Sequence, residues 1–426
     1  MPRFTLATAA TVFLAVSGCD SAPMFPPATA DASTPTVETT SKSDGWEWVS
    51  WEGQTSGGMT CRSGTKTGYG RRSATASPAF QSDSLLIVLQ GGGWCDASGC
   101  SNGNASSYGR DDFFKPIGAP EDDRPIILNR GIFFFDQVSD VRTFDRNPFS
   151  DAGKTRGTKW DIVFVPYCTG DFHMGSAEGV TIPGESSPQS FVGYDNLEVM
   201  LDDFGYTEAH AGPAPSTIVL AGVSAGGFGT AGVYGLFADR FAGSTIHLLD
   251  DSGPFLPYNV AFGPNYQNNL VTLWEATEAF PSATDCPDCW PPNGTGSKAR
   301  LDALLPYYVS AFPTASFGVA VFDADAPLRT FFGTQSQGNG VLPEAEFREG
   351  LARLRTDLDL ARDPVYKNAG TFYMGGEYHG SILKAPLYDA TRKSNLSDTL
   401  LTTWIGDVID SDPAVPHRGT PNPTSP

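Results

Sequence analysis

The chain has 426 residues, of which 28 are basic and 48 acidic, so its net charge is −20. This balance excludes a nucleic-acid-binding protein, because phosphate binding needs a basic surface, and it gives no help in attracting a polyanionic substrate. The length beyond residue 45 suits a single large α/β enzyme, and the sequence shows no internal repeat.

The first residues have the pattern of an export signal. Arg3 is followed by a largely apolar stretch at residues 4–16, which is too short to span a bilayer. The sequence from Leu14 to Cys19 then resembles a bacterial lipobox, in which cleavage precedes a cysteine whose thiol carries lipid. Residues 1–18 are therefore predicted to be a lipoprotein signal peptide, with the membrane anchor on Cys19. The alternative is an ordinary secretory signal in which Cys19 is incidental.

Residues 19–44 are rich in Pro, Ser, Thr and Ala and have no apolar periodicity. Such a composition buries too little surface to offset the entropy of ordering, so it predicts a flexible tether. We expect residues 45–426 to form a single catalytic domain, a monomer held at the cell envelope (periplasm or cell surface) through Cys19.

Short apolar runs bounded by polar or glycine-rich segments predict buried strands of a parallel sheet. They lie at residues 85–89, 161–167, 217–220, 246–249, 317–322 and 371–374. Apolar residues at helical spacing recur between or after them, at 191–201, 347–358 and 400–408. This alternation predicts an α/β-hydrolase-like, doubly wound, mostly parallel sheet flanked by helices. Ligands bind such a sheet beyond the carboxyl ends of its strands.

A triple glycine directly follows the first of these strands, at Gly91, Gly92 and Gly93. Bare backbone at this place can approach a substrate, and it corresponds in position to the loop that completes an oxyanion hole. Gly93 and Gly92 are the candidate donors. Trp94 is a candidate for a pocket wall, or it packs against a disulfide.

The strand at 217–220 runs into Gly222-Val223-Ser224-Ala225-Gly226. A serine flanked by small residues, between a strand and a helix, is the pattern of a nucleophile elbow. It predicts Ser224 as the nucleophile, and the Ala225 N–H as an oxyanion donor.

A serine nucleophile needs a base, and five histidines are present. His379 follows a late strand, as the order serine, acid, histidine of this fold requires. His173 follows a strand end and is predicted to line the site, but it precedes the serine. His247 lies in an apolar strand, His210 in a Gly/Pro/Ala turn before the elbow strand, and His417 in the polar C-terminal tail. We therefore predict His379 as the base.

The acid that orients the base should follow the strand at 317–322. Asp325 is the preferred candidate, and Asp323 is the alternative at the same strand end. Asp250 and Asp251 are rivals after the preceding strand, where residues 251–255 could equally form a turn that shapes the pocket.

Six cysteines remain besides Cys19, and in an oxidising compartment an even set predicts three disulfides. Six cysteines allow fifteen pairings. Cys286 and Cys289 lie in a Pro-rich stretch without a thioredoxin-like pattern, which favours a loop disulfide over a redox pair. Their spacing also suits half of a zinc site, but no second pair follows.

Four motifs together resemble the pectin acetylesterase/Notum family. They are Gly-Gly-Gly-Trp-Cys at 91–95, Pro-Tyr-Cys-x-Gly-Asp at 166–171, Gly-x-Ser-Ala-Gly-Gly at 222–227 and Asp-Ser-Gly at 251–253. The resemblance extends from about residue 60 to residue 404, and it implies a carbohydrate or protein-lipid deacylase with a Ser-Asp-His triad.

The resemblance implies roles for individual residues. It implies Ser224 as nucleophile and His379 as base, oxyanion donors at Ala225 and the glycines 92–93, and Cys61–Cys168 and Cys95–Cys100 disulfides. We expect a serine esterase that removes O-acyl, chiefly O-acetyl, groups from an extracellular polysaccharide such as pectin, without metal or cofactor. The alternatives are a small-ester or lipid deacylase, or a non-catalytic glycan-binding lipoprotein. The candidate pocket residues are Trp94, Asp171, His173, Asp251 and Phe255.

Overall fold

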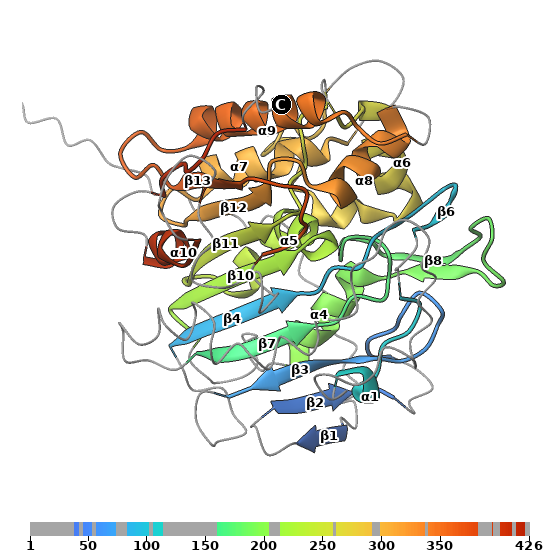
Figure 1. Ribbon diagram of the computed structural model, residues 1–426. Helices are drawn as coiled ribbons and strands as arrows, with labels where there is room; N and C mark the ends of the chain where they lie inside the picture. The colour runs from blue at the N-terminus through green and yellow to red at the C-terminus, as the bar shows by residue number, and fades with distance from the viewer. Residues whose placement is uncertain are drawn as a thin grey trace, which may run out of the picture.

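The structure is a computed structural model (Figure 1), and it describes residues 38–41, 46–52, 57–73, 83–101, 105–113, 160–203, 214–258, 261–291, 299–336, 340–381, 394, 401–410 and 415–421. The predicted signal peptide, Cys19 and His210 lie outside these residues. Within the described ranges, no helix combines the length and apolarity that a membrane-spanning segment requires.

A nine-stranded sheet forms the centre of the molecule, in the order β1-β2-β3-β7-β4-β10-β11-β12-β13. Its parallel part consists of β7 (Asp161–Val165), β4 (Ser84–Leu89), β10 (Thr217–Val223), β11 (Thr245–Asp251), β12 (Phe317–Phe322) and β13 (Ala369–Met374). All six predicted strands are present, and the predicted α/β-hydrolase-like fold is confirmed. Their runs of Val, Ile, Leu and Phe suit strands that are covered on both faces.

Three antiparallel strands extend one edge of this sheet. They are β1 (Glu38–Ser41), β2 (Trp46–Ser50) and β3 (Gly68–Arg72), and β3 pairs with β7. These three strands were not predicted from the sequence. Strand β1 lies within residues 19–44, the range predicted as a tether, and residues 38–41 belong to the sheet instead. The backbone of an edge strand pairs with its neighbour without an apolar pattern of its own, and Thr39 and Thr40 are β-branched residues that favour this conformation.

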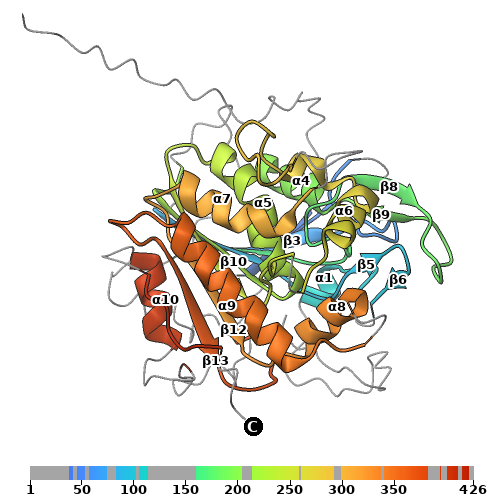
Figure 2. The ribbon, with the colours of Figure 1, turned by 90° about the horizontal axis from the view of Figure 1, so that it is seen from above.

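Helices cover both faces of the sheet. They are α1 (Arg110–Phe113), α4 (Gly193–Asp203), α5 (Ala225–Arg240), α6 (Pro264–Leu273), α7 (Leu304–Ala311), α8 (Ala326–Ser336), α9 (Glu344–Ala361) and α10 (Leu401–Asp410). The helices predicted at 191–201, 347–358 and 400–408 correspond to α4, α9 and α10. In Figure 2, α10 lies on one side of β13 and α9 on the other.

Alternate residues of the central strands build two separate cores. Leu85, Ile87 and Leu89 of β4 belong to the larger cluster with the buried residues of α4, α5, α7 and α9. Leu86 and Val88 point to the other face, into a cluster with the apolar side of α10. This alternation is the two-residue period of a strand with both faces buried. The sheet is therefore packed between two layers.

The loops that follow the parallel strands meet at one edge of the sheet. The register pairs Leu89 with Gly222, Val223 with Asp251, and Phe322 with Met374. The chain therefore leaves β4, β10, β11, β12 and β13 at nearly the same level. The candidate residues of the sequence analysis follow these strand ends.

Candidate active site

Ser224 lies at a sharp turn between β10 and α5. Its φ is 57° and its ψ is −122°, a conformation that non-glycine residues rarely adopt. The backbone N–H of Ser224 donates to the carbonyl O of Asp251 with an N···O distance of 2.8 Å. A strained serine at the start of a helix is the geometry expected of a nucleophile elbow.

Glycines allow neighbouring backbone to approach this turn. A Cβ on Gly226 would lie 2.0 Å from the carbonyl O of Leu89, so only glycine lets the elbow pack on the end of β4. A Cβ on Gly91 would lie 2.8 Å from Cβ of Ser224 and 3.1 Å from N of Ala225. The first glycine of the triple-glycine loop therefore lies directly against the serine.

The other two glycines of that loop, Gly92 and Gly93, are the predicted donors. Gly93 has a φ of +84°, which favours glycine, and Gly92 is buried. Gly91 was missed as a site residue. It is the first glycine after β4, two positions beyond Leu89, which pairs with Gly222 next to the serine turn, and this position is the signal that could have identified it.

His379 and Asp325 form a buried pair. Nδ1 of His379 donates to the carboxylate of Asp325, at 2.8 Å from both Oδ1 and Oδ2. Both side chains are almost fully buried. The Leu328 N–H, in the first turn of α8, donates to Oδ1 of Asp325 at 2.9 Å and fixes the carboxylate. Because Nδ1 faces a carboxylate, it carries the proton, and the neutral ring keeps its lone pair on Nε2.

Asp323, the alternative acid, has different partners. Its Oδ1 accepts the Gly376 N–H at 3.2 Å and lies 3.8 Å from Arg348 Nη2. Backbone hydrogen bonds from Asp323, Ala324 and Ala326 to the segment 374–377 continue this connection. Asp323 therefore holds the loop that leads to His379, and Asp325 contacts the imidazole itself.

Asp251 connects the histidine loop to the elbow. Its carbonyl accepts the Ser224 N–H, and its carboxylate accepts the Ser381 N–H at 2.6 Å and the Ser381 hydroxyl at 3.1 Å. Next to it, the Ser252 hydroxyl accepts the Gly380 N–H at 3.1 Å. The residue before Ser224 and the residue after His379 are also adjacent, since a Cβ on Gly380 would lie 3.0 Å from Cγ1 of Val223. The predicted nucleophile and base thus belong to adjoining loops.

The rival Asp250 is occupied elsewhere. Its Oδ1 accepts the Gly253 N–H at 2.8 Å. Burial raises the pKa of the Asp250 carboxyl well above its ordinary value, and the neighbouring Asp251 adds to this. Asp250 shapes the turn after β11.

Asp171 and His173 are buried beneath the glycine loop. Nε2 of His173 is 2.9 Å from the carbonyl O of Gln90, the residue before Gly91. Burial lowers the pKa of His173 to about 4. Burial also raises the pKa of Asp171 to about 6, against hydrogen bonds from Thr169, Gly193 and His173 that lower it. These two predicted pocket residues therefore hold backbone in place.

Two aromatic candidates differ in their surroundings. Trp94 is half-buried, and its Nε1 donates to the Tyr266 hydroxyl at 3.1 Å. Its ring lies edge-on to Phe331, with 4.7 Å between centroids. Phe255 is buried and packs on Phe228. Trp94 is thus partly accessible beside the glycine loop, whereas Phe255 belongs to the core.

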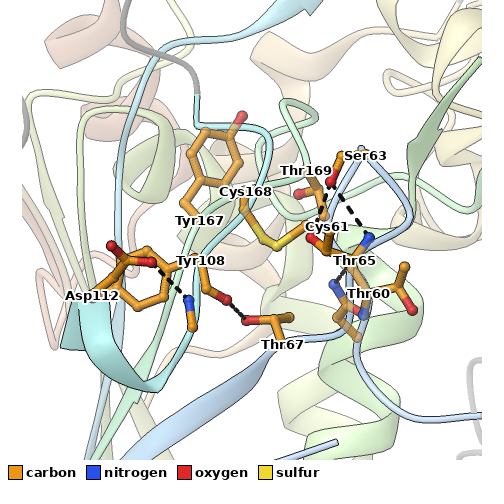
Figure 3. Close-up of a disulfide and its surroundings, with 12 residues drawn as sticks. Thr60, Cys61, Ser63, Thr65, Thr67, Tyr108, Asp112, Tyr167, Cys168 and Thr169 are labelled. Atoms are coloured by element: carbon orange, nitrogen blue, oxygen red, sulfur yellow. Dashed lines mark hydrogen bonds between the residues drawn. A yellow bond between two sulfur atoms is a disulfide. The ribbon is translucent and has the colours of Figure 1, made fainter. Parts of the chain in front are cut away.

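Three disulfides are present, and they are the three that were predicted. Cys61–Cys168 joins the segment before β3 to the loop after β7, and Figure 3 shows it between Thr60 and Tyr167, with Thr169 close by. Cys95–Cys100 closes the hairpin that follows the glycine loop, and Cys286–Cys289 closes a short loop. Two of the three disulfides therefore fix segments next to the candidate site.

The other described histidines have structural partners. Nδ1 of His247 accepts the Ser316 N–H at 3.1 Å inside the sheet. Nδ1 of His417 accepts the Thr371 N–H, also at 3.1 Å, and its Nε2 donates to Asp359. Burial lowers the pKa of His417 to about 4. Only His379 has a carboxylate on Nδ1 among the histidines that the structure describes.

The fold and the arrangement at its carboxyl edge place the chain in the α/β-hydrolase class. The model of the pectinacetylesterase family matches residues 155–289, and this confirms the resemblance to the pectin acetylesterase/Notum family. The match implies carboxylic ester hydrolase activity. It includes His173, Ser224 and Asp251, whereas Asp325 and His379 lie beyond it. A comparison with curated proteins finds no match.

Proposed function

We propose that the protein is a serine esterase that removes O-acetyl groups from an extracellular polysaccharide such as pectin. The observation that carries this proposal is the Asp325–His379 pair, on a loop that adjoins the strained Ser224. The family match supports acylated polysaccharide as the substrate class.

In the proposed reaction, the Ser224 hydroxyl attacks the acyl carbonyl carbon while Nε2 of His379 takes its proton. Asp325 stabilises the imidazolium. The N–H groups of Ala225, Gly92 and Gly93 donate to the oxyanion of the tetrahedral intermediate. As the bond between the acyl carbon and the sugar oxygen breaks and the acyl-enzyme forms, the imidazolium protonates that oxygen, and the sugar leaves with a free hydroxyl. Water, deprotonated by His379, then releases acetate and restores the serine.

The test compares the wild type with Ser224→Ala on p-nitrophenyl acetate and on acetylated pectin. We expect the variant to lose activity by about 10⁴-fold or more. A fluorophosphonate should label Ser224 in the wild type alone. If both proteins are equally inert and no label attaches, the esterase proposal is wrong, and binding of acetylated pectin by the inert protein would favour the glycan-binding alternative.

The acyl group is tested separately with p-nitrophenyl esters of increasing chain length. The proposal expects the highest kcat/KM with acetate. Faster turnover of long-chain esters would instead favour a lipid deacylase, and turnover of small esters without release of acetate from pectin would favour a small-ester carboxylesterase.

We also propose that the protein is exported and attached to the cell envelope through lipidated Cys19, on the basis of the lipobox-like sequence at residues 14–19. Metabolic labelling with a fatty-acid analogue should mark the wild type and not Cys19→Ser. Equal labelling of both would contradict the anchor.

A further inference from the structure

His173 makes a directional contact with the residue before the glycine loop. Its side chain is buried, and its Nε2 lies 2.9 Å from the carbonyl O of Gln90. A carbonyl only accepts, so Nε2 carries the proton and donates. The C=O of Gln90 and the N–H of Gly91 belong to one planar peptide unit. The imidazole therefore helps to fix the plane in which the glycine loop begins.

The backbone that presents His173 is strained. Phe172 and His173 have φ values of 55° and 61°, two consecutive non-glycine residues in the left-handed region. Such a conformation persists only where the surroundings enforce it. The carboxylate of Asp171 accepts the His173 N–H at 3.1 Å, and the Tyr167 hydroxyl accepts the Phe172 N–H at 3.0 Å. Strain held in this way in the loop after β7 points to a function for the side chain it presents.

Gln90 is bound to the same segment by its other polar groups. Its N–H donates to the carbonyl O of Val165 at 3.0 Å, and its Oε1 accepts the Tyr167 N–H at 2.9 Å. The next residue, Gly91, faces Ser224 and Ala225. The peptide between Gln90 and Gly91 thus connects the 165–173 segment to the elbow.

We infer that His173 is a positioning residue for the proposed esterase reaction: through Gln90 it sets the orientation of the glycines 91–93 against Ser224. The inference rests on the proposed function. Oxyanion donors act only when they point at the place where charge develops, so a small displacement of this loop lowers the rate of the chemical step. Substrate binding in the ground state does not need this alignment.

The test compares His173→Phe and His173→Gln with the wild type, in the full-length protein. Phenylalanine retains a ring against Tyr167, which lies 4.8 Å away between centroids, but has no donor. Glutamine can donate its amide N–H to the carbonyl O of Gln90. Kcat and KM are measured on p-nitrophenyl acetate, and each preparation is normalised to the fraction of serine labelled by a fluorophosphonate.

We expect His173→Phe to lower kcat roughly 10- to 100-fold per labelled site, with KM within about twofold. His173→Gln should remain within about fivefold of the wild type, because the donor is restored. The matched control is His247→Phe, a buried histidine inside β11, whose kcat per labelled site should not change. A loss of folded protein alone lowers the labelled fraction and leaves kcat per site unaltered.

If His173→Phe does not fold, His173→Met and His173→Gln form a second pair of similar length, with the donor in only one of them. The methionine variant should then be at least about tenfold slower than the glutamine variant. If the two variants of either pair have the same kcat per labelled site, while the wild type hydrolyses esters, the positioning role of His173 is wrong. The proposed esterase function is then unaffected. A wild type without esterase activity would overturn the proposed function, and this role with it.

Discussion

Two buried histidines lie at the same edge of the sheet, and their hydrogen-bond partners differ. His379 donates from Nδ1 to the carboxylate of Asp325. His173 donates from Nε2 to the carbonyl O of Gln90. The two rings therefore have opposite tautomers when neutral. His379 keeps a lone pair on Nε2, the atom suited to take a proton from a serine, whereas His173 uses that atom as a donor.

This difference teaches that burial and position do not by themselves identify a base. Both side chains are about equally inaccessible, at 3% and 2% relative exposure. A carboxylate partner stabilises the charged ring that a base forms, while a carbonyl partner fixes a neutral ring as a donor. The partner on each nitrogen predicts how the two residues will respond to the same substitution.

The largest contrast should come from two single variants in which glutamine replaces His379 or His173. His379→Gln should lower kcat on p-nitrophenyl acetate by about 10⁴- to 10⁶-fold, because an amide cannot take the serine proton. His173→Gln should stay within about fivefold of the wild type, because the donor to Gln90 remains. Steady-state kinetics of the two variants measure the contrast directly. The reverse order of effects would make His173 the base and reject the mechanism.

The next contrast is between the two aspartates. Asp325→Asn should lower kcat by about 10⁴-fold, because an amide at this place can hold the imidazole in the wrong tautomer and does not stabilise its charged form. Asp323→Asn should cost less than about tenfold, since an asparagine oxygen can still accept the Gly376 N–H. The measurement is kcat for both variants across pH. If kcat falls to a similar extent in both variants, the loop held by Asp323 and the carboxylate of Asp325 act as one unit.

The sequence predicted the parts of the molecule that depend on local pattern. Strands β4 to β13 of the parallel part are continuous apolar runs, and the serine turn needs small residues next to one another. The antiparallel strands β1 to β3 were missed for different reasons: the edge strand β1 has no apolar pattern, whereas β2 and β3 are short and carry their buried aromatic residues, Trp46, Trp48 and Tyr69, among polar residues and glycines. The Cys61–Cys168 and Cys95–Cys100 pairs came from the family resemblance, because spacing alone leaves fifteen pairings open.

The roles of individual site residues depend on contacts that a sequence does not display. Asp323 and Asp325 follow the same strand end, and only the hydrogen bonds separate the one that contacts His379 from the one that holds its loop. His173 reaches a carbonyl 83 positions earlier in the chain. Gly91 was overlooked because all three glycines look alike until the elbow is placed against the first.

The smallest expected contrast concerns stability and pH. The pKa of His173 falls to about 4 in the folded protein, below its ordinary value of 6.5. A lowered histidine pKa contributes stability that is present above pH 6.5 and is lost as the pH falls toward 4, because the unfolded chain then takes up the proton. The contribution is about 3 kcal/mol at most. Asp171 acts in the opposite direction, since its raised pKa of about 6 favours the folded state as the pH falls below 6.

The wild-type stability curve therefore contains two opposed terms, and His173→Phe removes only one of them. We expect the free-energy difference between wild type and variant, measured by denaturant unfolding, to shrink steadily from pH 7 to pH 4.5. Asp171 remains in both proteins, so most of its contribution cancels in that difference. The comparison variant is His247→Phe, which makes the same substitution at a buried histidine away from the glycine loop. If the free-energy difference between wild type and variant is constant with pH, the pKa of His173 is the same in the folded and unfolded states. Burial would then not be what keeps the ring neutral and donating.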